Sequence, residues 1–389
     1  MGQSTCGSAA AEFVPGWAKS AVWYQIFPER FRNGDPDNDP TLESMRGAWP
    51  HDLSEPWQVH PWTSDWYELA PYERDNGKSF WFNVQRRRYG GDLEGVLGKL
   101  DYLEELGVNA LYFNPVFKAP SSHKYDGETY HHIDPHLGPD PRGDLRLIAT
   151  ETPDDPSTWV WTAADLLVLE LIRELHNRGM RIIFDGVFNH MGLRSWPFRD
   201  VLAHQRDSRF SDWFAIESWR DRRRGTRFVY RGWAGVRELP ELRQDEDGIV
   251  PGPRKYIFDA TRRWMDPDND GDPSDGIDGW RLDVAFCISH AFWKSWRKWV
   301  RSINPEAYLT AEVVAEPAEL EPYLRGDEFD AVMNYNFGFI CDEYFFAREK
   351  RISTTAFDRT LRELREAFPR QVGYVMQNLF GSHDTARLA

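Results

Sequence analysis

Four acidic residues stand at the carboxyl ends of short apolar runs: Asp185, Asp283, Glu312 and Asp384. Parallel β/α barrels take their catalytic groups from the carboxyl ends of several different strands. One such acid would be explained as a helix cap or as half of a structural ion pair. Four of them, two with a histidine nearby, instead predict the mouth of a catalytic barrel.

Strand-like runs alternate with helix-like segments along the chain. The predicted strands span residues 21–27, 110–117, 181–188, 280–286, 308–313, 331–337 and 374–380. Helix-periodic segments lie between them, including 92–107 and 162–179, and the second ends at a glycine as helices often do. Alternation of this kind predicts βα units that build a parallel sheet.

The predicted fold class is α/β, a (β/α)8 TIM-type barrel with an inserted subdomain after the third strand. We expect an N-terminal extension over 1–20, the first part of the barrel over 21–190, the inserted subdomain and its connection over 191–278, and the rest of the barrel over 279–389. A closed barrel of this type needs eight strands, because an open edge leaves backbone groups unpaired. Since seven strands are predicted, we expect the chain to end before the eighth.

Composition excludes several classes of protein. A formal net charge of −15 argues against nucleic acid and anionic membranes as partners, because both require clustered basic residues. The three cysteines have no metal-binding spacing and predict no disulfide framework. No run approaches the roughly 20 apolar residues of a membrane span. The first residues do not read as a signal peptide, so we expect a cytoplasmic protein; the sequence does not predict its oligomeric state.

The order of the motifs resembles the α-amylase family of glycoside hydrolases, nearest to its neopullulanase and cyclomaltodextrinase branch. DGVFNH, GWRLDVA, AEV and GSHDT resemble the four motifs of the family, and LPELR resembles a short motif of its inserted B domain. The resemblance runs from about residue 18 to the end. It implies a retaining hydrolase of α-1,4-glucosidic bonds in starch, maltooligosaccharides, pullulan or cyclodextrins, acting through a covalent glycosyl-enzyme intermediate.

The residues themselves support catalytic roles for three acids. Retaining glycosidases need two carboxyl groups about 5–5.5 Å apart, one ionised and one protonated. Asp283 is the predicted nucleophile, because Arg281 lies two residues earlier on the same strand face and would lower its pKa. Glu312 lies among apolar neighbours, which suits a general acid/base. Asp384 is predicted to bind sugar hydroxyls, and the same motif positions carry these roles in the family.

A second group of residues is predicted to bind the substrate: Tyr125, Asp126, Asp185, Asn189, His190, Arg281 and His383. Tyr125 would offer a face on which a sugar ring stacks. The two histidines would donate hydrogen bonds to the same sugar, and Asp185 would orient Arg281.

An oxygen-rich loop predicts a Ca²⁺ cofactor. Asn33, Asp35, Asn38 and Asp39 lie within seven residues, and Ca²⁺ prefers oxygen ligands of this kind. The related branch has a calcium site at an NGDP-x-NDP loop completed by a later Gly-Gly-Asp, which the resemblance assigns to Gly90 and Asp92. A cluster of Asx and proline turns is the alternative interpretation.

A second acidic loop carries a D-x-D-x-D-G pattern at Asp266, Asp268 and Asp270. Ile277 occupies the position where an EF-hand needs glutamate, so the loop is not an EF-hand. A second calcium site and a solvated turn both remain possible from the sequence.

Two other functions are compatible with the motifs. An α-glucan transglycosylase or a sucrose- or trehalose-type isomerase of the family would use the same acids. Phe286 and Cys287 depart from the residues that follow the second motif in the hydrolase branch, so the preference of that branch does not transfer. A non-catalytic carbohydrate-binding module usually loses the carboxylates that this chain retains.

Overall fold

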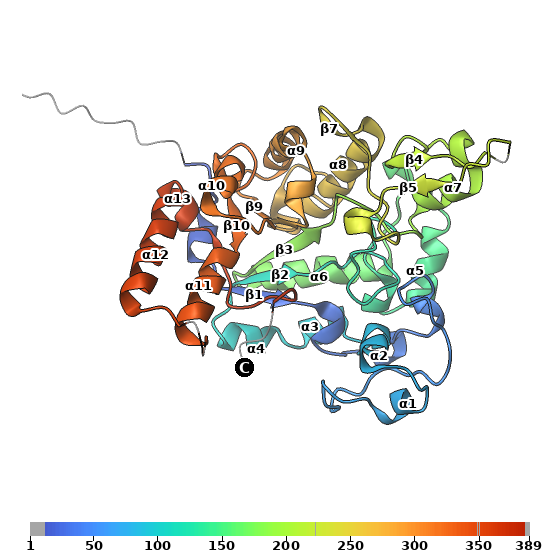
Figure 1. Ribbon diagram of the computed structural model, residues 1–389, viewed down its shortest axis with the longest axis horizontal. Helices are drawn as coiled ribbons and strands as arrows, with labels where there is room; N and C mark the ends of the chain where they lie inside the picture. Colours follow the sequence, from blue (N-terminus) through green and yellow to red (C-terminus); the bar gives the residue numbers. More distant parts are fainter. Residues whose placement is uncertain (1–11, 222, 348, 350, 386–389) are drawn as a thin grey trace, which may run out of the picture.

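The computed structural model describes residues 12–221, 223–347, 349 and 351–385, so Cys6 lies outside the described residues. A parallel sheet forms its centre (Figure 1). Its strand order is β1-β2-β3-β8-β9-β10-β11. The strands are β1 Trp23–Ile26, β2 Ala110–Phe113, β3 Arg181–Gly186, β8 Gly279–Leu282, β9 Tyr308–Ala311, β10 Ala331–Asn334 and β11 Gln377–Asn378. All seven predicted strands are present, and they form a nearly closed barrel-like sheet. Among the described residues, no pairing joins β11 to β1.

The principal helices follow the strands in the predicted alternation. They are α3 Leu93–Leu97, α4 Leu100–Glu105, α6 Ala163–Asn177, α8 Pro251–Met265, α9 His290–Ile303, α10 Pro317–Leu320, α11 Tyr335–Phe345, α12 Thr354–Glu366 and α13 Arg370–Gly373. Helix α6 shows why the sequence folds as it does. Thr162 caps its first turn in a reciprocal box with Asp165, and Gly179 leaves the helix at φ +71°.

The predicted strands are longer than those observed, and three elements illustrate the differences. The segment 92–107 forms two helices, α3 and α4, rather than one. The run 331–337 ends as a strand at Asn334, whose side chain accepts from Phe337 N at 3.3 Å and caps α11. In the run 374–380, only Gln377 and Asn378 pair as a strand. Apolar side chains continue past each strand end into the next turn, which is why the sequence pattern extended these strands too far.

Longer connections add small elements outside the sheet. These are α1 Pro71–Arg74, α2 Phe80–Arg86, α5 Pro141–Ile148, α7 Trp196–His204 and the two-stranded antiparallel sheets β4 Ile216–Ser218 with β5 Val229–Tyr230 and β6 Gln244–Asp245 with β7 Gly248–Ile249. Helix α7 with β4 and β5 lies at one end of the molecule, and α11, α12 and α13 lie at the other (Figure 1).

Within the predicted insertion 191–278, helix α8 belongs to the layer around the sheet. It packs against α9 and buries Ile257 and Trp264 completely. Trp264 meets Phe184 of β3 with ring centroids 6.0 Å apart, so α8 covers the sheet as the other helices do. No helix among the described residues is both long and apolar enough to cross a membrane.

Candidate active site

Arg281 is the centre of the site and is fully buried in β8. Its Nη1 lies 2.7 Å from Asp185 Oδ1 and 2.9 Å from Asp283 Oδ1. Its Nη2 lies 2.9 Å from Glu312 Oε2, in an ion pair whose angle is not that of a hydrogen bond. Three of the four predicted acids, from the ends of the neighbouring strands β3, β8 and β9, therefore share one guanidinium.

The turn after β8 holds Glu312 beside Asp283. Asp283 N donates to Gly186 O at 3.1 Å, which fixes the end of β8 against β3. Val284 then adopts φ +39° and ψ +46°, a left-handed conformation that is strained for a β-branched residue. In this conformation its N–H donates to Glu312 Oε2 at 2.9 Å. The strained turn thus directs the Val284 N–H at Glu312, and this hydrogen bond orients the Glu312 side chain.

Burial dominates the electrostatics of Asp283. Its carboxyl is only 7% exposed, and burial raises its pKa well above the ordinary value of 3.8. Arg281 lowers the pKa, while the negative charges of Asp185 and Glu312 raise it further. Arg281 therefore acts in the expected direction, but burial, which favours the neutral carboxyl, outweighs it.

Tyr125 and His383 cover one side of this cluster. The Tyr125 hydroxyl donates to Asp185 Oδ2 at 2.9 Å and lies 2.7 Å from His383 Nε2. The two rings are stacked, with centroids 5.6 Å apart and an interplanar angle of 10°. Burial and the positive charge of Arg281 lower the pKa of His383 to about 4. The imidazole is therefore neutral at physiological pH.

Asp384 is the fourth predicted acid and is the most accessible of the set. Its side chain is 48% exposed, and Oδ2 lies 3.1 Å from His383 Nε2. Partial burial of the carboxyl and the negative charge of Glu312 raise the pKa of Asp384, while the positive charge of Arg281 lowers it. Asp384 therefore lies within electrostatic range of the cluster without contacting Arg281.

The other predicted substrate ligands lie around this cluster rather than in it. His190 is buried, its Nε2 lies 3.2 Å from Tyr125 O, and burial lowers its pKa to about 4. Asn189 O accepts from Leu242 N at 3.0 Å. Asp126 accepts a short hydrogen bond from Ser121 Oγ. The structure brings neither Asn189 nor Asp126 into contact with Arg281.

Sequence reasoning missed two strand residues that support the site. Tyr112 of β2 donates its hydroxyl to Asp185 Oδ2 at 2.7 Å. Gln25 of β1 lies 2.9 Å from His383 Nδ1 through its Nε2. Tyr112 lies on β2, which pairs with β3, and Gln25 lies on β1, which pairs with β2, so only knowledge of the strand order would have identified them. A cavity of about 310 Å³ opens beside His383. It is lined in part by Gln25, Tyr24 and Trp66.

The predicted calcium residues form one cluster at the start of α3. Asp92 is fully buried and accepts from Gly34 N, Asp35 N, Gly95 N and Asn38 Nδ2 at 2.6–3.3 Å. Asn33 Nδ2 donates to Asp39 Oδ1 at 2.7 Å. Gly90 has φ +70°, and a Cβ there would lie 2.0 Å from Asp39 Oδ1.

Two amide oxygens of this cluster lack partners. Asn33 Oδ1 and Asn38 Oδ1 are buried and accept no hydrogen bond. Buried polar atoms are nearly always paired, so these two oxygens are available as acceptors or as metal ligands. The donor set, which contains only oxygens, fits Ca²⁺.

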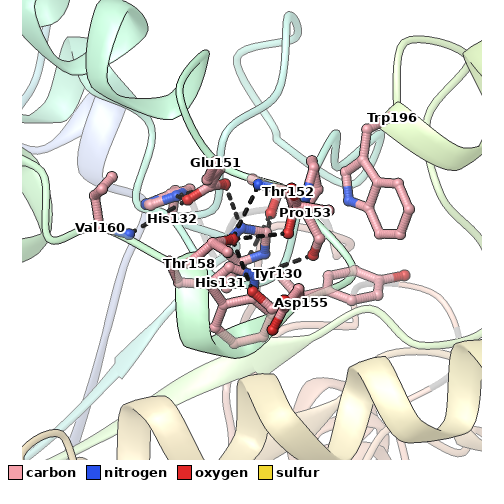
Figure 2. Close-up of polar contacts among 12 residues, drawn as sticks. Tyr130, His131, His132, Glu151, Thr152, Pro153, Asp155, Thr158, Val160 and Trp196 are labelled. Carbon is pink, nitrogen blue, oxygen red and sulfur yellow. Dashed lines mark hydrogen bonds and ion pairs between the residues drawn. The ribbon is translucent and has the colours of Figure 1, made fainter.

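A second polar cluster, at the loop 139–161, was not predicted (Figure 2). His131 Nε2 lies 2.7 Å from Glu151 Oε1, and His132 Nε2 lies 3.0 Å from Glu151 Oε2. His132 Nδ1 lies 2.7 Å from Asp165 Oδ2. His132 thus lies between two carboxylates, which raise its pKa although burial opposes them.

Two histidines and a glutamate also have the donor types of a transition-metal site. All four ring nitrogens are already engaged, since both Nε2 atoms pair with Glu151, His132 Nδ1 pairs with Asp165, and His131 Nδ1 lies 2.7 Å from both Thr129 Oγ1 and Tyr256 Oη. We therefore interpret the cluster as an ion-pair network that fixes the loop 139–161. In the sequence, this cluster was indicated only by the adjacent histidines of the run YHH and by a later glutamate.

Comparison with known proteins gives a consistent result. The alpha-amylase family model, described as the alpha amylase catalytic domain, matches residues 25–150 and 162–389. Neopullulanase 2 of Thermoactinomyces vulgaris is 40% identical over 375 residues, which cover 96% of this chain and 52% of the relative. Cyclomaltodextrinase of Geobacillus thermopakistaniensis is 36% identical, with 96% and 51% covered. The chain spans about half the length of these curated relatives.

A solved structure has the same architecture. The cyclic α-maltosyl-(1→6)-maltose hydrolase of Arthrobacter globiformis, in complex with its cyclic sugar, superposes with a TM-score of 0.72 at 31% identity. The match covers 96% of this chain and 67% of that one. The family model omits residues 151–161, where Glu151 and the rest of its loop lie.

Proposed function

The chain belongs to the α-amylase family, and we propose from this that it acts as a retaining hydrolase of α-1,4-glucosidic bonds in α-glucans. The observation that carries the proposal is the contact of one buried guanidinium, Arg281, with Asp185, Asp283 and Glu312. Such an arrangement places two carboxyl groups with different surroundings at the carboxyl ends of adjacent strands, where barrel enzymes perform their chemistry.

In the first step, the carboxylate of Asp283 attacks the anomeric carbon. Glu312 donates its proton to the glycosidic oxygen, and the bond to the leaving sugar breaks. In the second step, Glu312 accepts a proton from water, the water oxygen attacks the anomeric carbon, and the bond to Asp283 breaks. Two inversions give net retention. The mechanism requires carboxyls about 5–5.5 Å apart, and a guanidinium shared by both supports this spacing.

Arg281 and the turn after β8 position the two acids. Arg281 stabilises the charged form of Asp283, against the burial that favours the neutral form. Asp185 accepts from the same Nη1 that contacts Asp283 and so fixes Arg281, which makes it a positioning residue. The N–H of Val284 holds one oxygen of Glu312, which leaves the other to exchange its proton with the substrate.

The sugar in the site would contact the stacked pair Tyr125 and His383 and the exposed carboxylate of Asp384. Because the pKa of His383 and that of His190 are lowered to about 4, both are neutral hydrogen-bonding groups at physiological pH. The cavity beside His383 is lined by aromatic rings, among them Trp66 and Tyr24, which suit the apolar faces of further glucose units.

The substrate class comes from the relatives. Their names concern pullulan, cyclodextrins and a cyclic maltosyl-maltose. We propose that this chain acts on α-glucans of these kinds, including starch and maltooligosaccharides. A transglycosylase is the alternative, favoured by one observation: Phe286, three residues after Asp283, is 55% exposed, and an aromatic face there could hold an acceptor sugar in place of water.

We propose Ca²⁺ as a cofactor at the loop that joins Asn33, Asp35, Asn38 and Asp39 to Gly90 and Asp92. The unpaired oxygens of Asn33 and Asn38 support it, and so does the pKa of Asp39, which burial and the neighbouring carboxylates raise. When bound, the ion supplies positive charge to a buried acidic cluster. It takes no part in the bond-breaking steps.

The test is release of reducing sugar from starch, pullulan and cyclodextrin by the protein as its complete gene encodes it. Asp283→Asn keeps the shape of the side chain and removes the nucleophile, so activity should fall by at least about 10⁴-fold. Asp101→Asn, an aspartate of the distant helix α4 that is 85% exposed, is the matched control and should retain full activity. Equal activity of Asp283→Asn and the parent would overturn the proposal.

A further inference from the structure

An acidic loop between α8 and β8 brings several carboxylates together. Asp266, Asp268 and Asp270 each offer an oxygen, and these oxygens all lie within 4.8 Å of one another. Asp266 is 2% exposed, whereas the other two are exposed to solvent. The three follow the spacing of the first half of an EF-hand loop. Exposed acidic turns are common, so spacing alone does not establish a site.

Two unpaired oxygens in this loop provide independent evidence. Asp266 Oδ1 and Asp275 Oδ1 are buried and have no hydrogen-bond donor. The other oxygen of Asp266, Oδ2, lies 3.3 Å from Arg262 Nη1, which also bonds Asn269 Oδ1 at 3.3 Å. Arg262 therefore leaves Asp266 Oδ1 unpaired. A buried charged acceptor without a donor is unfavourable, and proteins rarely retain one without a partner.

Asp275 lies further along the same loop, and burial raises its pKa, as do the charges of Asp268 and Asp266. These carboxylates repel one another, and the loop holds two buried oxygens, Asp266 Oδ1 and Asp275 Oδ1, that accept no hydrogen bond. A bound cation would remove the repulsion and satisfy both oxygens at once.

We propose that residues 266–275 form a site for Ca²⁺, separate from the site proposed at Asp92. Asp266, Asp268 and Asp270 supply the first ligands, and Asp275 replaces the glutamate that closes an EF-hand. The ligand set contains only oxygens, which favours a hard cation over zinc. Ca–O distances of about 2.3–2.6 Å allow two ligands of one ion to lie up to about 5 Å apart, and the oxygens of Asp266, Asp268 and Asp270 lie within 4.8 Å of one another.

The position of the loop indicates what the ion does. The loop precedes Gly279, the first residue of β8, and so lies at the amino end of the sheet, whereas Asp283 follows the carboxyl end. The next residue after Ile277 is Asp278, which accepts from Ile182 N of β3 at 2.9 Å. An ion here would hold α8, β3 and β8 together. Residues at this face of a barrel govern stability and not chemistry.

The experiment is equilibrium dialysis with Ca²⁺ on the metal-stripped protein and its variants. The parent should bind two ions per chain, and the double variant Asp268→Asn/Asp270→Asn should bind one fewer. Asp39→Asn removes a ligand of the other loop and should retain the ion at 266–275. Asp247→Asn, an exposed aspartate outside both loops, should bind as the parent does.

Thermal unfolding provides the second readout. Saturating Ca²⁺ should raise the Tm of Asp39→Asn by about 2–5 °C, and this rise should vanish when Asp268→Asn/Asp270→Asn is added. Hydrolytic rate below the transition should be the same with and without those two substitutions. The inference fails if the double variant binds as many ions as the parent. If the loop at Asp92 binds no ion and the loop 266–275 binds one, the parent should bind one ion and the double variant none.

Discussion

Asp185 binds Arg281 directly across neighbouring strands: the two are register partners in β3 and β8, and Nη1 lies 2.7 Å from Oδ1. Both side chains are fully buried. Because Asp185 and Asp283 both bind Nη1, Nη2 remains available for the ion pair with Glu312. The orientation of both proposed catalytic acids therefore depends on an ion pair that does not itself contact the bond to be broken.

Arg281→Lys should impair both activity and stability. A lysine ammonium cannot contact Asp185, Asp283 and Glu312 in this planar arrangement, so buried carboxylates lose their partner. Breaking a buried ion pair typically costs about 3–5 kcal/mol in the free energy of unfolding. We expect kcat/KM to fall at least about 100-fold, measured with maltooligosaccharides beside urea unfolding. Arg325→Lys, at an exposed ion pair with Glu321, is the control and should change neither quantity.

The pH dependence of kcat/KM should show an acidic limb above the ordinary range of an aspartate. Burial raises the pKa of Asp283, and its carboxylate must be ionised to attack, so the rate rises as pH increases through that raised pKa. His190 and His383, with pKa values lowered to about 4, are neutral above about pH 5 and add no limb there. A limb at the ordinary value of 3.8 would contradict this account.

Removal of Ca²⁺ should lower stability through the loop around Asp92. Chelation leaves Asp39 close to Asp35 and Asp92, whose charges already raise its pKa. We expect EDTA to lower the Tm by about 2–5 °C and added Ca²⁺ to restore it. The comparison is best made in the variant Asp268→Asn/Asp270→Asn, where this loop is the remaining candidate. A Tm insensitive to EDTA in that variant would contradict the assignment.

Glu151→Gln should destabilise the fold, because Glu151 is the carboxylate shared by His131 and His132 (Figure 2). A cationic His132 then has only one carboxylate partner, Asp165. We expect a loss of about 3 kcal/mol in the free energy of unfolding. Glu104→Gln, at an exposed pair with Arg178, should lose less than about 1 kcal/mol.

The free energy of unfolding lost in Glu151→Gln should depend on pH. The pKa of His132 is raised, so its contribution to stability is full below its ordinary value of 6.5 and disappears as pH rises through the raised value. The pKa of Glu151 is lowered to about 2, so its contribution is full above 4.5 and disappears as pH falls towards about 2. Urea unfolding should therefore show the largest effect of Glu151→Gln near about pH 5.5 and a smaller one once the pH exceeds the raised pKa of His132.

Local patterns in the sequence predicted the strands and three of the acids around Arg281. Asp283 follows the end of β8, two residues after Arg281, so strand periodicity was enough to predict that both side chains lie on one side. The residues at which strands end could not be predicted from periodicity. At β10, for example, Asn334 caps α11 by a side-chain hydrogen bond that an apolar run does not reveal.

Properties that depend on tertiary structure were beyond the sequence. The pKa of Asp283 rises because three acids from three strands converge in a buried site, and no single motif contains that information. Tyr112 supports Asp185 only through the pairing of β2 with β3. Glu151 reaches His131 from a loop that the family model omits, so the resemblance to the family could not predict it.

The most direct test of the account is to identify the residue that becomes glycosylated. The protein as its complete gene encodes it would be treated with an activated 5-fluoro-α-glucosyl fluoride, digested, and analysed by tandem mass spectrometry. The account predicts one sugar attached to the carboxylate of Asp283, and slower hydrolysis of that adduct in Glu312→Gln. A sugar on another residue, or turnover with inversion at the anomeric carbon and no adduct, would contradict it.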